Sequence, residues 1–386
     1  MAEVYFWGIM DIIKIRKKNH AFIQVDCDPS VANELCDFFT FYVPGYKFMP
    51  AYKNKMWDGK IRLFDTRTRE LYAGLYAYVE EFANAEGRDY RIELQHDAYY
   101  GLPKTDTQID MSFMRDLTLT AAGKEIQARD YQLQAIEHGL TKKAAMLISP
   151  TASGKSLIIY SLLRYVLEAQ EKRALIVVPT TSLVEQMYAD FADYSTHDDG
   201  FNIETCHRIY AGRPKFADKE RVIITTWQSI YKMPGTWFEQ FGAIFGDEAH
   251  NFKAKSLTSI LSKCRDAEYR FGTTGTLDGT QTHKLVLEGL FGPAYYVTTT
   301  KKLMDEGSLA DLDISVLLLK YDEQLRRQFG KQTYQQEIDY IVTHQKRNQL
   351  ITNLALDQDG NTLVLFQYVE KHGKPLYNMI KEKAHA

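Results

Sequence analysis

The sequence has no uninterrupted apolar run close to the roughly 20 residues that a membrane-spanning helix needs, which argues against a helical transmembrane protein. It also has few cysteines, and none of them forms a Cys-x-x-Cys pair, so a zinc ribbon and a disulfide framework are both disfavoured. The basic run at residues 16–18 follows an apolar start, the reverse of a secretory signal. These absences predict a protein of a reducing cytoplasm.

A large charge excess and low-complexity tracts are missing as well. The 386 residues carry 47 basic and 50 acidic side chains, a net charge of −3, and 45% of the residues are hydrophobic. These fractions are typical of globular proteins and argue against disordered, collagen-like or coiled-coil chains. The length predicts about two or three domains. A nucleic-acid binder with this balance must concentrate its positive charge locally.

Residues 1–110 predict a small α+β domain. Apolar and polar residues alternate on both sides of a polar turn between residues 11 and 26, the pattern of a β-hairpin. Asp28 and Pro29 then predict a helix start, because aspartate accepts hydrogen bonds from the first N–H groups and proline suits the first helical position. Further elements are predicted as short strands near 60–65 and 91–94 and a helix near 76–86.

From about residue 127 the pattern changes to short apolar runs separated by helical segments. Unbroken apolar strands of this kind predict a parallel sheet buried on both faces, within an α/β lobe at residues 111–298. The predicted strands lie at 145–149, 174–178, 221–225, 243–247 and 269–273. After a polar break, residues 314–319 and 362–366 predict strands of a second, incomplete α/β unit at residues 299–386.

A strand, a loop and a helix follow one another between residues 145 and 169, the context that a phosphate-binding P-loop requires. Backbone N–H groups of the loop and the positive end of the helix would bind triphosphate oxygens. Lys155 would neutralise the β- and γ-phosphates, and the Ser156 hydroxyl would ligate Mg²⁺. Ser149 stands where the usual pattern has its first glycine. The predicted nucleotide-binding residues of the loop are Pro150, Thr151, Ala152, Ser153, Gly154, Lys155 and Ser156.

Two adjacent carboxylates, Asp247 and Glu248, follow the buried strand at 243–245, where parallel sheets bind ligands. Asp247 would hold Mg²⁺, and Glu248 would orient and deprotonate the attacking water. Acidic pairs mostly cap helices, but one that lies about ninety residues after a P-loop predicts an ATPase. A zinc site that includes His250 is disfavoured because suitably spaced further ligands are missing.

Several segments in a fixed order make the chain resemble a superfamily 2 helicase. The stretch from Arg129 to Gln132 resembles the Q motif, in which glutamine recognises adenine, and the resemblance implies that both residues bind nucleotide. Residues 178–186 and 224–229 resemble motifs Ia and Ib. In these enzymes such motifs contact the sugar-phosphate backbone, which implies DNA contacts for Thr180 and Thr226.

Further motifs extend the resemblance towards the end of the chain. Asp247-Glu248-Ala249-His250 resembles the acidic helicase motif, and Thr274-Gly275-Thr276 resembles motif III, which links hydrolysis to lobe movement. The resemblance therefore implies a coupling role for His250, Thr274, Gly275 and Thr276. Residues 363–367 lie where motif IV would open a second RecA-like lobe.

A narrower resemblance, to phage recombination and repair helicases of this superfamily, is carried by segments along nearly the whole chain. It implies an ATP-dependent DNA helicase that uses ATP and Mg²⁺ and acts in the host cytoplasm. It also implies sequence-independent binding to single-stranded or branched DNA, including forks, Holliday junctions and R-loops with their RNA–DNA hybrids. The carrying segments are 42–50, 57–63, 238–241, 299–307 and 331–338.

Basic and aromatic residues alternate between residues 42 and 69, which predicts a DNA-binding surface in the first domain. Lys53, Lys55 and Arg62 are the predicted DNA contacts, and Trp57 is expected in the core. A grip on duplex DNA and a wedge at a fork both stay open.

Nothing after Phe366 resembles motifs V and VI, which in this superfamily bring arginines to the γ-phosphate. We therefore expect this chain to bind ATP and DNA but to hydrolyse ATP poorly alone. The open alternatives are an inactive DNA-binding fragment and another superfamily 2 motor, such as a restriction-enzyme translocase or an RNA helicase.

Overall fold

A computed structural model describes residues 11–88, 90–95, 108–215, 219–251, 254–277, 281–310, 312–321, 323–329 and 332–384. The chain divides into two compact units, Met1–Asp311 and Leu312–Ala386. Within the described residues, no helix combines the length and the apolar character that crossing a bilayer requires.

The first domain is built on a four-stranded sheet, and its predicted α+β character is confirmed. The hairpin forms as expected, with Lys14 opposite Asp26. The Asp28 carboxylate accepts from the backbone N–H of Ser30, which fixes the start of the first helix. In sheet order the strands are β5 (Glu70–Tyr72), β2 (Phe22–Asp26), β1 (Asp11–Lys17) and β6 (Tyr90–Gln95), covered by α1 (Pro29–Phe38) and α3 (Tyr76–Ala83).

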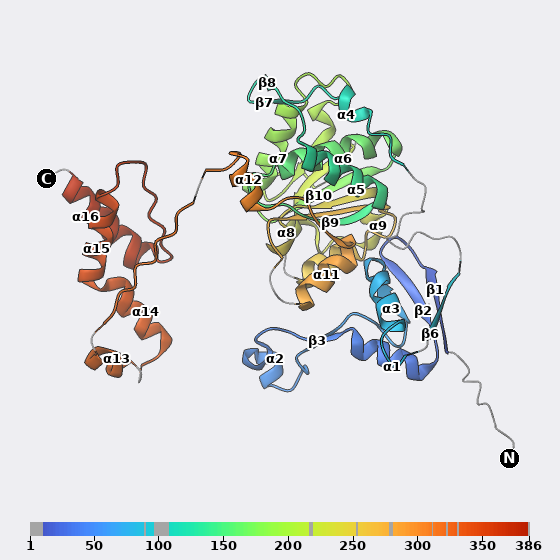
Figure 1. Cartoon of the computed structure of the whole chain (residues 1–386), viewed down its shortest axis with the longest axis horizontal. Helices are drawn as coiled ribbons and strands as arrows, with labels where there is room; N and C mark the ends of the chain where they lie inside the picture. Colours follow the sequence, from blue (N-terminus) through green and yellow to red (C-terminus); the bar gives the residue numbers. More distant parts are fainter. Residues whose placement is uncertain are drawn as a thin grey trace, which may run out of the picture. The chain divides into compact units, whose positions relative to one another are not determined.

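An arm projects from this domain between α1 and the rest of the sheet. Figure 1 shows α2 at the far end of this excursion, with β3 between α2 and α1. We call residues 40–62 the basic arm. Its elements are β3 (Thr40–Tyr42), a 3₁₀ turn η1 (Tyr46–Phe48), α2 (Pro50–Lys53) and β4 (Lys60–Arg62), with β3 and β4 paired antiparallel.

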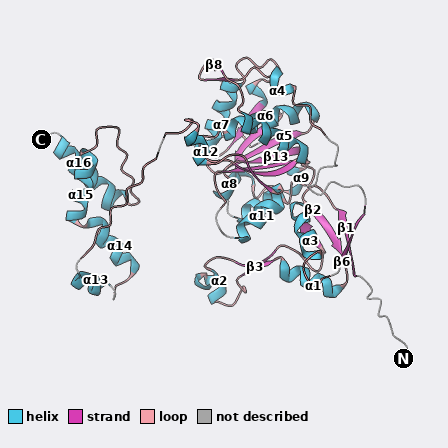
Figure 2. Ribbon diagram, viewed as in Figure 1, coloured by secondary structure: helices cyan, strands magenta, loops and turns pink. Residues whose placement is uncertain are grey.

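The second part of the first unit contains a seven-stranded sheet whose neighbouring strands are all parallel, as predicted. Figure 2 shows these strands in magenta among cyan helices. The order is β11 (Cys206–Ile209), β12 (Val222–Thr226), β10 (Arg173–Val178), β13 (Phe241–Gly246), β14 (Tyr269–Thr274), β9 (Ala144–Ile148) and β15 (Ala294–Tyr296).

Alternate residues of these strands enter two separate hydrophobic cores, because successive side chains of a strand face opposite sides. On β9, Ala145 and Leu147 belong to one core, whereas Met146 and Ile148 belong to the other. The first core is covered by α5 (Asp130–Lys142), α6 (Lys155–Ala169) and α7 (Thr181–Tyr194). The second is covered by α8 (Trp227–Ile230), α9 (Gly235–Phe238), α10 (Ala254–Leu261) and α11 (Gln281–Phe291).

Short elements complete the first unit. They are a 3₁₀ turn η2 (Ala73–Leu75), α4 (Phe113–Asp116), β7 (Thr120–Ala121), β8 (Lys124–Glu125), η3 (Ile203–Thr205), η4 (Ala249–Asn251) and α12 (Thr300–Asp305).

In the second unit the described regular elements are helices, and the segments 314–319 and 362–366 form neither helix nor strand, so the strands predicted there are wrong. A strand needs a neighbour that supplies hydrogen bonds and covers its apolar side chains. Neither segment pairs with another in the described residues, and Ile314 and Leu363 are 77% and 81% exposed. The helical elements are α13 (Glu323–Phe329), α14 (Tyr334–Thr343), α15 (Gln345–Leu356), the π-helical turn η5 (Val369–Gly373) and α16 (Lys374–Ala384). The domain boundaries stay a prediction.

The first domain is fixed to the parallel-sheet lobe through α11. Both contribute side chains to one continuous hydrophobic core. The backbone of η2 approaches α11 so closely that a Cβ at Gly74 would collide with the carbonyl oxygen of Glu288. Beside this contact, the Tyr78 hydroxyl donates to Glu288 Oε2 at 2.6 Å. Glycine is needed here because the two backbones touch.

We call this contact between η2 and α11 the seam, and Gly74→Ala is a sensitive probe of it. The added methyl meets backbone rather than a flexible side chain, so we expect a loss of about 1–3 kcal/mol in the free energy of unfolding, read from urea denaturation. Gly235→Ala is the matched control, because a Cβ there has no neighbour within 4 Å. Equal stability of the two variants would show that the seam is looser than described.

Candidate nucleotide and DNA sites

Strand order brings the sequence motifs together at the carboxyl end of the parallel sheet. The P-loop follows β9, Asp247 follows β13, and β14 lies between these two strands. Because all three strands are parallel, their carboxyl ends lie side by side, and the Thr274–Thr276 loop that ends β14 is placed between the other two motifs. The Ser149 N–H donates to the carbonyl of Thr274 at 2.8 Å, which joins two of these loops directly.

The P-loop conformation depends on Gly154. Its φ of +79° lies in the left-handed region, and a Cβ there would collide with Nε2 of Gln132. Inside the loop, the Ser153 hydroxyl donates to the Pro150 carbonyl at 2.6 Å and lies 2.5 Å from the Ser149 hydroxyl. The serine that replaces the usual first glycine therefore supports the loop through a side chain that glycine lacks.

Lys155 and the acidic pair meet in a single pocket of about 260 Å³. Lys155 Nζ lies 2.9 Å from Glu248 Oε1, and both side chains are largely buried. Glu248 adopts a φ of +49°, in the left-handed region that non-glycine residues adopt uncommonly. The pocket residues are Thr151, Ala152, Gly154, Lys155, Ser156, Leu183, Gln186, Met187, Asp190, Asp247 and Glu248. The predicted metal ligands Ser156 and Asp247 thus line the same pocket, while their roles stay predictions.

Asp247 is buried at the base of this pocket. Burial raises the pKa of its carboxyl, and the nearby Glu248 carboxylate raises it further. The Thr273 hydroxyl donates to Asp247 Oδ1 at 2.6 Å and favours the charged form, which acts in the opposite direction. Thr273 belongs to β14, so the strand between the two motifs also orients the carboxylate.

The predicted Q-motif residues lie against the P-loop. Gln132 Nε2 donates to the Ser153 carbonyl at 2.8 Å, and its Oε1 accepts from the Arg129 N–H at the start of α5. The Tyr131 hydroxyl donates to the same Ser153 carbonyl, and the Arg129 guanidinium donates to that hydroxyl. Gln132 therefore connects α5 to the loop in this structure, and its expected contact with adenine stays a prediction.

The predicted coupling residues form a chain between the acidic pair and motif III. His250 Nδ1 lies 2.6 Å from the Thr274 hydroxyl and 3.4 Å from Glu248 Oε2. The Thr274 hydroxyl donates to the Thr276 carbonyl. Gly275 lies beside the lysine, since a Cβ there would be 3.9 Å from Lys155 Nζ.

One face of α7 belongs to the nucleotide pocket and was missed from the sequence. Asp190 lines the pocket, and burial raises the pKa of its carboxyl. The Tyr194 hydroxyl lies 2.8 Å from the Ser156 hydroxyl. Leu183, Met187, Asp190 and Tyr194 recur at helical spacing, which is the signal that could have revealed this face.

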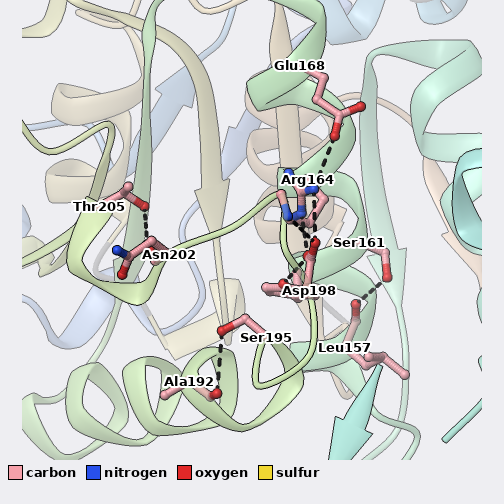
Figure 3. A network of polar contacts seen from close by, with 11 residues as sticks. Leu157, Ser161, Arg164, Glu168, Ala192, Ser195, Asp198, Asn202 and Thr205 are labelled. Atoms are coloured by element: carbon pink, nitrogen blue, oxygen red, sulfur yellow. Dashed lines mark hydrogen bonds and ion pairs between the residues drawn. The ribbon is translucent and has the colours of Figure 1, made fainter. Parts of the chain in front are cut away.

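A buried ion pair fixes α6, the helix that begins at Lys155, beside α7. Arg164 Nε donates to Asp198 Oδ2 at 2.7 Å, as Figure 3 shows, and the Tyr160 hydroxyl donates to the same oxygen. Asp198 lies after the end of α7, and its Oδ1 accepts from the Gly200 N–H. Removing one partner of such a pair leaves an uncompensated buried charge.

The predicted motif Ia and Ib contacts line a groove of about 540 Å³ at the ends of β10, β11 and β12. Thr180 caps α7 by accepting from the Leu183 N–H, and the Thr226 hydroxyl lies 2.9 Å from that of Ser229. Arg213 and Lys215, which sequence reasoning missed, bring positive charge to this groove. The signal was a basic pair directly after the Gly212 turn.

On the basic arm, Lys53 and Lys55 line a shallow pocket together with Trp57. Arg62 is paired with Asp58 at 2.5 Å, so its charge is partly neutralised. Trp57 was expected in the core, but it is only half-buried and belongs to neither hydrophobic core of the described residues. Its indole N–H donates to the Lys60 carbonyl instead.

Two known protein families match separate parts of the chain. Residues 11–95 match the family described as "DNA helicase UvsW, N-terminal", and residues 125–279 match the family described as "Type III restriction enzyme, res subunit". The chain is 34% identical over 377 residues to the ATP-dependent DNA helicase uvsW of Enterobacteria phage T4. That alignment covers 96% of this chain and 73% of the relative.

Solved structures of the T4 protein show the same fold. One T4 UvsW crystal structure aligns with a TM-score of 0.67 at 32% identity, covering 96% of this chain and 73% of the other. A second, also of the UvsW helicase from bacteriophage T4, aligns with a TM-score of 0.66 at 34% identity and covers 74% of this chain and 99% of the other.

The buried carboxyl makes Asp247→Asn a test of the site's electrostatics. A pKa raised above the unfolded value means that Asp247 costs stability once it ionises, so stability falls as pH rises through the raised value. The amide cannot ionise and still offers an oxygen to the Thr273 hydroxyl. We expect a higher Tm for the variant at about pH 7 and a shrinking difference towards about pH 4, close to the ordinary aspartate pKa of about 3.9. Asp199→Asn, at an exposed position, should change little at either pH. An equal gain at both pH values would exclude ionisation as the cause.

Proposed function

The chain belongs to the family of UvsW, the superfamily 2 ATP-dependent DNA helicases, and on that premise we propose that it remodels branched DNA by ATP-driven movement. Forks, Holliday junctions and R-loops with RNA–DNA hybrids are the proposed substrates, bound without sequence preference. Because the similar protein is encoded by a phage, the proposed place of action is the host cytoplasm.

The single pocket that joins the P-loop to the acidic pair carries this proposal. Loop N–H groups and Lys155 would bind the phosphates of ATP. Phosphate oxygens compete with Glu248 for Lys155, so nucleotide binding would free the Glu248 carboxylate to orient a water molecule. The Ser156 hydroxyl and Asp247 carboxylate are hard oxygen ligands of the kind that Mg²⁺ prefers. The ion, when bound, would neutralise charge on the transferring phosphoryl group.

Movement would be coupled to the nucleotide through His250. This side chain touches both Glu248 and Thr274, so a shift of Glu248 reaches the motif III loop directly. The loop is followed by α11, to which the first domain is fixed. A change of nucleotide state would thereby change the position of the domain that carries the basic arm.

A restriction-enzyme translocase is the second candidate, because residues 125–279 match the family of the res subunit of type III restriction enzymes. The match to the UvsW amino-terminal domain at residues 11–95 favours the helicase. Strand displacement on branched DNA, linear duplex and RNA duplex distinguishes these motors.

Lys155→Ala should weaken ATP binding. A charged hydrogen bond of about 1.5–3 kcal/mol is lost, which corresponds to a roughly 10- to 150-fold rise in the Kd of a fluorescent ATP analogue. Lys301→Ala, at an exposed lysine, is the control. Glu248→Gln should retain binding while lowering any measured turnover. Unchanged affinity in the Lys155 variant would refute the proposed nucleotide site.

The groove lined by Thr180 and Thr226 should bind the phosphates of a DNA strand. For Arg213→Ala combined with Lys215→Ala, we expect weaker single-strand binding and a salt dependence whose slope falls by about one per lost contact. Lys124→Ala, at an exposed position on β8, should leave the slope unchanged. A double variant with the wild-type slope would place the strand elsewhere.

A further inference from the structure

The basic arm presents large apolar side chains to solvent. Phe48 is 80% exposed and Met56 is 74% exposed, which is unusual for side chains of this size. The arm also carries five basic residues against one acidic residue, Asp58. Exposed apolar groups among positive charges favour a partner that offers apolar faces and negative charge together.

The tyrosines of the arm support its shape. Tyr42 stacks on Tyr46 with ring centroids 4.7 Å apart, and Tyr52 meets Tyr46 edge-on at 4.8 Å. Lys60 Nζ lies 5.0 Å above the Tyr42 ring. These aromatic rings are therefore engaged with one another, whereas Phe48 remains largely exposed.

Backbone contacts hold the two apolar residues in place. The Phe48 N–H donates to the Gly45 carbonyl, and the Met56 N–H donates to the Ala51 carbonyl, both at 2.9 Å. Gly59 contacts Tyr46 so closely that a Cβ would collide with the ring. Phe48 and Met56, which we call the tip of the arm, are thus held in place before any partner binds, and this reduces the entropy cost of binding.

The base of the arm is continuous with the first domain. Phe41 and Ile61, on β3 and β4, pack against the hydrophobic core that extends into the parallel-sheet lobe. The Leu63 N–H donates to the Phe39 carbonyl across the base. A load on the tip would therefore be transmitted to the lobe that holds the nucleotide pocket.

We propose that Phe48 and Met56 form a wedge that stacks on the terminal base pair at a DNA branch point, while Lys47, Lys53 and Lys55 bind the flanking phosphates. This inference rests on the proposed DNA function and specifies how the arm serves it. Base faces are covered inside a continuous duplex and become accessible where strands separate, so a stacking tip favours branches. Phe and Met side chains are known wedges between base steps. Arg62, neutralised by Asp58, contributes less to this grip.

The test measures base unstacking by the full chain. It uses a fork with 2-aminopurine in the pair next to the branch, and a linear single strand of the same sequence. The wild type should raise 2-aminopurine emission on the fork. Phe48→Ala combined with Met56→Ala should lose this rise and bind the fork roughly tenfold more weakly, with linear-strand affinity within about twofold of wild type.

Matched variants separate the wedge from the charge. Leu94→Ala, at a half-exposed apolar position of the same domain, should behave as wild type. Phe48→Trp should keep the emission rise, because a larger ring still stacks. Lys53→Ala with Lys55→Ala should weaken binding to both DNAs and lower the salt slope by about two.

Three results would overturn the wedge. One is a Phe48/Met56 variant that retains both the emission rise and fork affinity. Another is an equal loss of affinity for the fork and the linear strand. The third is a change of oligomeric state in sedimentation, which would assign Phe48 and Met56 to a contact with a second copy of the chain. If the wild type bound neither ATP analogue nor linear DNA, the proposed function itself would fail, a result distinct from these three.

Discussion

One ion pair, between Lys155 Nζ and Glu248 Oε1, joins the two halves of the nucleotide pocket. The pair exists because the parallel strands β9 and β13 both end at the carboxyl end of the sheet, with only β14 between them. Three hydrogen bonds surround this ion pair. Thr273 donates to Asp247, His250 contacts Thr274, and Ser149 joins the P-loop to β14. The left-handed backbone at Glu248 and the raised pKa of the buried Asp247 carboxyl lie at this same point.

The same lobe forms one body with the domain that carries the basic arm. A shared hydrophobic core, the glycine contact between η2 and α11, and the Tyr78–Glu288 hydrogen bond form the seam. Because α11 follows the motif III loop, the domain that would meet DNA is one helix away from the nucleotide pocket. A motor that pushes DNA against a fixed surface needs this kind of stiff connection.

Sequence reasoning located the strand, loop and helix around Lys155, the acidic pair and five of the seven strands of the parallel sheet, because each depends on local pattern. It missed β11 and β15, the two edge strands of that sheet. It missed Asp190 and Tyr194, whose relevance depends on how α7 packs beside α6. It also placed strands at 314–319 and 362–366, where the apolar pattern is present but no neighbouring strand supplies hydrogen bonds in the described residues. Trp57 was misplaced for a similar reason, since composition does not reveal which aromatic rings a small arm can cover.

The residues alone determined the fold class and the chemistry: a glycine, a lysine and a serine at a helix start, and two carboxylates after a buried strand. These signals are short-range, so they survive without knowledge of the rest of the chain. Tertiary structure decided that Ser156 and Asp247 share one pocket, that Gln132 holds the P-loop, and that Phe48 and Met56 remain exposed. Such facts depend on strand order and packing between distant segments, which side-chain periodicity does not encode.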